Sequence, residues 1–281
     1  LVGSEMCIRD RHIMAYVSYD NVRVGINALD TVNTGYSYSN AVYAVNFSAS
    51  NSTALKRVRR IGQQMDYYIQ TGPKSSNISA TVVPVTGVGS NQLVDYIAMT
   101  GDSVSGSYIH VPSYSFAKCF LKSLSFNLEP WKVTTATLQF DSYGLATGNG
   151  VSSYSAQQQT AKVISPLRGT SLTITSANFT QSLNIYENAN FSIEVERVAN
   201  YQIGDAYPAK TSVAKITKQV QVNGISNIDW LSDYQPNTTV TATLTMADGN
   251  TFSVAGVLSN QTVSIDSNGC LLYTSDAADD T

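Results

Sequence analysis

A run of alternating apolar and polar residues near the middle of the chain limits the fold more than any other feature. It covers residues 132–140 and includes Ala136, Thr137, Leu138, Gln139 and Phe140. This period-two pattern is typical of a strand with one buried face. A second extended run covers residues 117–126, and Pro130 lies between the two. Because proline donates no backbone N–H and fixes its own φ, we expect two sheet strands joined by a turn.

A short helix is predicted at residues 91–100, just before these strands, and a second at residues 226–234. Other strands are expected at 22–26, 36–49, 77–85, 170–179, 190–198, 213–222, 240–246, 251–257 and 261–265. Gly72 and Pro73 predict a turn at residues 69–74. A segment rich in Gly, Ser, Gln and Ala has no periodicity and predicts a linker. The pattern predicts a mainly β protein.

Both ends of the chain read like in-frame translations of a sequencing adapter. We therefore expect residues 1–13 and 270–281 to be adapter-derived flanks and set them aside. The remaining body contains one cysteine, Cys119, so it has no internal disulfide framework. It also has equal numbers of basic and acidic residues, which argues against a general nucleic-acid or membrane-surface binder.

Charged residues make up only 13% of the chain, and it contains 17 tyrosines. Typical soluble domains have about 25% charged residues. A surface poor in charge and rich in tyrosine is expected where other copies of the chain cover it. The alternative is a β protein whose exposed strand faces carry Ser and Thr. No apolar run approaches the roughly 20 residues of a spanning helix.

The two halves of the body repeat short motifs in the same order. The matched motifs are Arg57-Val58 with Arg197-Val198, Ile61-Gly62 with Ile203-Gly204, the helix signals at 91–100 and 227–234, and Asp141-Ser142-Tyr143-Gly144 with Asp266-Ser267-Asn268-Gly269. Shared order favours an internal duplication. We expect two tandem β-sandwich or barrel domains at 14–148 and 169–269, each with one short packed helix, joined by a linker at 149–168.

Recognisable reaction chemistry is missing from the sequence, so we expect no enzyme, catalytic residue, cofactor or metal. His110 is the one histidine well inside the body and is interpreted as structural. Cys119 is interpreted as a small buried hydrophobe. Glu194 and Glu196 share a strand face and could mimic a glycosidase pair, but a solvated strand face is the favoured interpretation.

The densest charge cluster consists of Lys56, Arg57, Arg59 and Arg60. Such residues could contact a phosphate backbone or pair with acids of a neighbouring subunit, or they could form a solvated turn. A neutral body without aromatic residues interleaved in this run favours a subunit interface or a solvated turn over nucleic acid. These four residues are the candidate site.

Residues 95–144 resemble the tail tube and related virion structural proteins of tailed bacteriophages. The resemblance lies in a short helix, Thr100-Gly101-Asp102, the strand through residues 120–126, Glu129-Pro130 and the strand at 133–143. It implies a β-sandwich or barrel with one packed helix, and rings that stack into a tube through which DNA passes. It also implies a virion location after assembly in the host cytoplasm, with other tail proteins as partners and no membrane.

If the chain has two units in tandem, a ring would contain either three chains with pseudo-six-fold symmetry or six chains that each carry an outer domain. A channel wall rich in Ser, Thr and Asn would let DNA slide without specific binding. We therefore expect residues 56–60 to face a neighbouring subunit and not the channel. The alternative function is a tandem β-sandwich surface binding module, an adhesin or a carbohydrate-binding protein.

Overall fold

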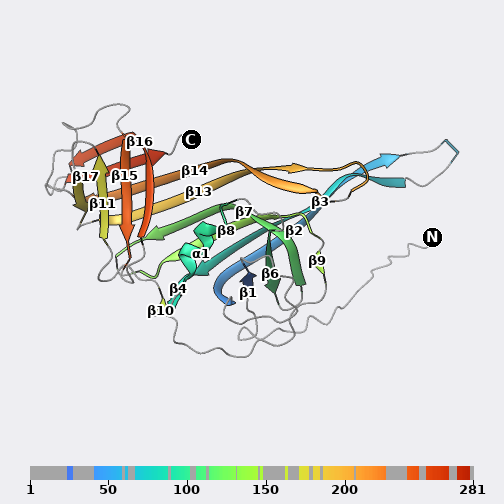
Figure 1. Ribbon diagram of the computed structural model, residues 1–281, viewed down its shortest axis with the longest axis horizontal. Coiled ribbons are helices and arrows are strands. Elements are labelled where there is room, and N and C mark those ends of the chain that lie inside the picture. The colour runs from blue at the N-terminus through green and yellow to red at the C-terminus, as the bar shows by residue number, and fades with distance from the viewer. Residues whose placement is uncertain are drawn as a thin grey trace, which may run out of the picture.

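The fold was analysed in a computed structural model. It describes residues 24–27, 41–58, 61–62, 67–87, 90–101, 106–111, 114–130, 132–144, 146–147, 162–163, 171–176, 180–183, 186–205, 207–225, 239–246, 251–265 and 271–278. The chain is mainly β, as the alternating pattern predicts, and its strands form one large antiparallel sheet and one small sheet (Figure 1).

Six strands of the first half close into an antiparallel barrel. They are β1 (Val24–Asn27), β2 (Ala41–Val58), β3 (Tyr67–Val83), β6 (Ser107–Val111), β7 (Tyr114–Leu128) and β8 (Thr135–Ser142). Their order is β7-β6-β1-β2-β3-β8, and pairing between β8 and β7 closes the ring. The predicted strands at 117–126 and 132–140 are thereby confirmed as β7 and β8. Their alternate side chains, such as Leu124 and Leu138, are buried in the core.

The predicted first helix is confirmed as α1 (Gln92–Ala98). Its Leu93 and Tyr96 side chains are buried in the hydrophobic core, so the helix packs through one face. Beside it lies a small sheet of β4 (Val85–Gly87), β5 (Ser90–Asn91) and β10 (Lys162–Val163). The predicted second helix, at 226–234, lies outside the described residues, and so does most of the predicted linker.

The second half extends the same sheet. Its strands are β11 (Ser171–Ser176), β12 (Thr180–Leu183), β13 (Tyr186–Asn200), β14 (Lys210–Ile225), β15 (Thr239–Thr245), β16 (Thr251–Ile265) and β17 (Leu271–Ala278). They run in the order β12-β11-β15-β16-β17-β14-β13, and β13 then pairs with β7. At this junction Phe126 stacks on Phe191 with ring centroids 4.9 Å apart, and Phe252 meets both rings edge-on.

Strand β7 therefore belongs to both halves of the molecule. One of its edges pairs with β6 near its start and with β13 near its end, while its other edge pairs with β9 (Ala146–Thr147) and β8. A buried core runs from the barrel into the second half. The division into domains at 14–148 and 169–269 stays a prediction.

Three local expectations differ from the structure. The turn predicted at 69–74 is wrong, because β3 runs through Gly72 and Pro73, where the pairing with β2 shifts register. Proline and glycine are tolerated at such bulges as well as in turns. The two strands expected at 251–257 and 261–265 form one strand, β16. Within the predicted flank at 270–281, the structure places β17 between β14 and β16.

Candidate assembly surface

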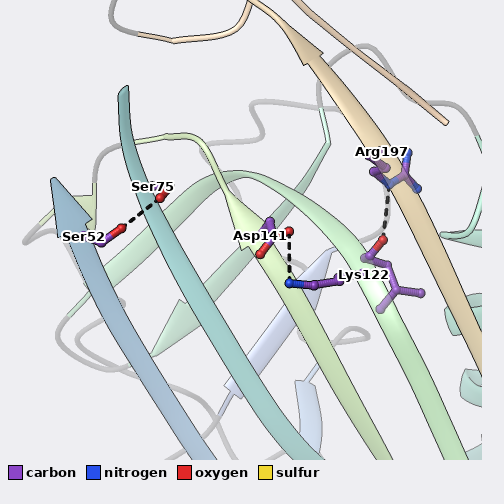
Figure 2. A network of polar contacts seen from close by, with 6 residues as sticks. Ser52, Ser75, Lys122, Asp141 and Arg197 are labelled. Atoms are coloured by element: carbon purple, nitrogen blue, oxygen red, sulfur yellow. Dashed lines mark hydrogen bonds and ion pairs between the residues drawn. The ribbon is translucent and has the colours of Figure 1, made fainter. Parts of the chain in front are cut away.

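Two long hairpins project from the body as arms, both toward the right of Figure 1. The first arm is the β2–β3 hairpin beyond the cross-strand pair of Ser52 and Ser75, whose hydroxyl oxygens lie 3.0 Å apart (Figure 2). The second arm is the β13–β14 hairpin beyond Glu194, the last β13 residue that pairs with β7. Each arm is thus a two-stranded ribbon attached to a larger sheet.

Neither arm has a strand partner along its outer edges within the described part of the chain. Strand β1 pairs only with the first two residues of β2, Ala41 and Val42. Strand β17 pairs only with residues 219–225 of β14. Residues 210–218 of β14 therefore pair with β13 alone. A two-stranded hairpin alone is marginally stable in water, and open edges recruit other strands. Both arms therefore have open strand edges in the described part of the chain.

The arm tips repeat the same dipeptide. Ile61 and Ile203 are fully exposed, at 106% and 107% of their reference area. Gly62 and Gly204 follow them with φ of 85° and 95°, a left-handed conformation that glycine adopts without strain. The motif match found in the sequence thus falls at equivalent places on two hairpins. The duplication itself stays a prediction.

Large apolar side chains are exposed along both arms. Those on the first arm are Leu55, Ile61, Tyr67 and Tyr68, and those on the second arm are Val198, Tyr201 and Ile203. Soluble monomers rarely expose such side chains in contiguous groups, and groups of this kind mark contact surfaces. Of the large apolar side chains that the structure describes as exposed, Tyr43, Val45, Tyr114 and Val133 lie elsewhere.

Arg197 fixes the root of the second arm to the barrel. Its guanidinium donates hydrogen bonds to the carbonyl oxygens of Met99, Thr100 and Gly101 at 3.0–3.3 Å, and so caps the end of α1. It also donates to Leu121 O at 3.2 Å (Figure 2) and lies 5.5 Å from the Phe120 ring centroid. A cation is favoured at this helix end, where carbonyl groups lack partners within the helix. Arg197 thereby couples the direction of the arm to the docked helix.

The outward face of the sheet between the arms carries uncharged polar side chains. Its middle row crosses six adjacent strands, from β14 to β2, through Gln219, Ser192, Ser125, Thr137, Thr81 and Asn46. The row on one side is polar across the same six strands, with Glu194 as its one charged member, and the row on the other side is polar from β14 to β8. The opposite face of the same strands is the hydrophobic core. We call these three rows of the outward face the polar wall.

The candidate residues Lys56 and Arg57 lie on β2 in the first arm, and both are exposed. Arg59 and Arg60 fall outside the described residues. The register sets Arg57 opposite Tyr68 and Val58 opposite Tyr67, which joins basic and aromatic side chains at this end of the arm. Sequence reasoning missed this pairing because the two strands are separate in the chain. Only the register brings them together.

The other candidate residues have structural surroundings. His110 is buried, with its Nδ1 2.8 Å from Ser115 Oγ, and burial lowers its pKa. Burial raises the pKa of the Cys119 thiol to about 12, despite weaker opposing hydrogen bonds, so this cysteine holds its proton at neutral pH. Beside the polar wall, Lys122 Nζ lies 3.9 Å from Asp141 Oδ2 (Figure 2). Among the described residues, no group of three His, Cys, Asp or Glu is placed to hold a metal ion.

Comparison with known proteins adds no family to this picture. No family model matches the chain, and a search of curated proteins found no match. In the described segments, no helix is long and apolar enough to cross a membrane. The class is therefore set by the fold: a mainly β protein built on a six-stranded antiparallel barrel, with a further sheet and two projecting arms.

Proposed function

We propose that the chain is a self-assembling structural protein that forms a ring, or stacked rings, around a neutral-walled conduit for DNA in the tail of a bacteriophage. The resemblance of residues 95–144 to tail tube proteins supports this choice. The single observation that carries it is the pair of projecting arms with uncovered edges, at the two ends of one polar wall. Three or six chains would make up a ring, with other tail proteins as further partners.

The geometry of the edges favours a ring over a symmetric pair. The uncovered edges belong to different strands, β2 at one end of the six-strand wall and β14 at the other. A contact between two unlike surfaces repeats head to tail, and it closes into a ring when the rotation between neighbours allows. Joining β2 of one copy to β14 of the next would remove both open edges at once.

The polar wall suits the inside of such a ring. Binding of DNA depends strongly on basic groups that neutralise phosphates, and the three wall rows contain none. Ser, Thr, Asn and Gln keep the face hydrated without holding the polyanion. In this arrangement the basic segment 56–60 belongs at the contact between subunits, and the wall belongs to the channel up to Glu194, where the second arm begins.

Electron microscopy of the purified full chain in negative stain tests this function. We expect closed rings or short stacks, each with a central opening wide enough for a DNA duplex. Particles of single-chain size, or rods without an opening, would contradict the proposal. A single-chain particle would instead favour the surface binding module.

A further inference from the structure

The first arm carries a large positive charge that the rest of the body balances. Between positions 53 and 74 the sequence contains five basic residues, Lys56, Arg57, Arg59, Arg60 and Lys74, and one acidic residue, Asp66. Because the body from 14 to 269 has equal numbers of both signs, the remainder of the body has a matching acidic excess. An arm that projects with this charge is attracted to the body of another copy.

The described acids differ in whether a cation already neutralises them. Asp141 has Lys122, and Glu129 has Lys132. Among the described residues, no ion pair joins a cation to Glu194 or Glu196, although the register sets Lys215 opposite Glu196 on β14. These two side chains are exposed, and they point to the same face because they lie two residues apart on β13. In the described part of the body, neither carboxylate has an ion pair of the kind that Asp141 and Glu129 have.

The position of the acid pair also suits an incoming arm. Glu194 is the last residue of β13 that pairs with β7, and Glu196 lies just beyond it, where the second arm begins. Arg197 ties this point to the helix end through hydrogen bonds, so the two carboxylates stand on a rigid base. A preorganised acidic pair at the root of an otherwise open ribbon is a favourable receptor for basic side chains.

We infer that Lys56 and Arg57 on the first arm of one copy dock against Glu194 and Glu196 of a neighbouring copy. This inference rests on the proposed self-assembly and names the contact that orients it. The exposed Tyr67 and Tyr68 lie on β3, opposite these basic residues, and supply the apolar part of the same contact. Opposite charges at its two sides also set a head-to-tail direction, because like arms repel each other.

A charge swap tests the contact, with mass measured by light scattering on the full chain. One variant carries Lys56→Glu and Arg57→Glu, a second carries Glu194→Lys and Glu196→Lys, and a third combines all four. We expect each single reversal to reduce the assembly to the 30.3 kDa of one chain, and the combined variant to restore it. The control, Lys132→Glu, reverses a charge on an exposed site away from both arms and should assemble as the wild type does.

The outcomes separate this inference from the proposed function. A wild type that never assembles overturns both. A wild type that assembles, with reversals that assemble equally well, overturns only the docking contact, and so does a combined variant that fails to recover. Circular dichroism confirms that each variant folds. If a reversal does not fold, the neutral variants Lys56→Gln/Arg57→Gln and Glu194→Gln/Glu196→Gln replace it, and each is expected to weaken assembly at least tenfold.

Discussion

At the scale of single residues, Arg197 tests whether the second arm depends on the helix end. Arg197→Ala removes four hydrogen bonds to carbonyl oxygens. Because bonds from a charged donor are stronger than average, we expect it to lower the free energy of unfolding by about 2 kcal/mol. Lys210→Ala, an exposed lysine on the same arm, should change it by less than about 0.5 kcal/mol. Urea unfolding followed by circular dichroism measures both, and equal losses would contradict the clamp.

His110 predicts a pH dependence of stability. Burial lowers its pKa in the folded state below the ordinary value of 6.5, so the unfolded chain takes up its proton first as pH falls. The contribution of His110 is fully present above about pH 7 and is lost as pH drops through 6.5 toward the folded pKa. His110→Gln should flatten the loss of melting temperature between pH 7 and 5. An unchanged slope in the variant would exclude His110 as its source.

At the scale of elements, the first arm should be separable from the fold. Ser52 and Ser75 face each other across β2 and β3, so an Asn-Gly turn can join them in place of residues 53–74. Because the barrel pairing lies on the near side of this pair, we expect the shortened chain to fold with a similar melting temperature but to remain a monomer. Calorimetry and light scattering on the same sample measure both properties. Retained assembly would show that the first arm is not the joining element.

Local sequence patterns predicted individual strands and the first helix, but not how the strands of the two halves pair. Alternation located β7 and β8 because a strand with one buried face imposes period two on its own residues. Gly72 and Pro73 gave a wrong prediction of a turn, because a bulge within a strand tolerates the same residues as a turn. The pairing of β7 with β13 joins segments far apart in the chain, and Arg197 bonds Met99 across 98 positions. Such contacts depend on the closed barrel, which no local pattern encodes.

At the scale of the whole molecule, the polar wall predicts weak DNA binding. A surface without a basic stripe releases few counterions, so we expect a Kd for duplex DNA weaker than about 100 μM at physiological salt. Fluorescence anisotropy with a labelled duplex measures this value, and a titration in sodium chloride gives the salt slope. Micromolar binding with a steep slope would mean that the basic first arm meets DNA and not a neighbouring chain.

The native mass of the full 281-residue chain tests self-assembly most directly. The whole chain is needed because ending it at residue 269 would remove β17 from between β14 and β16. Size-exclusion chromatography with light scattering should give one discrete species at three or six times 30.3 kDa, or larger multiples where rings stack. A single species at 30.3 kDa that persists at high protein concentration would contradict the claim that the arms join copies of this chain.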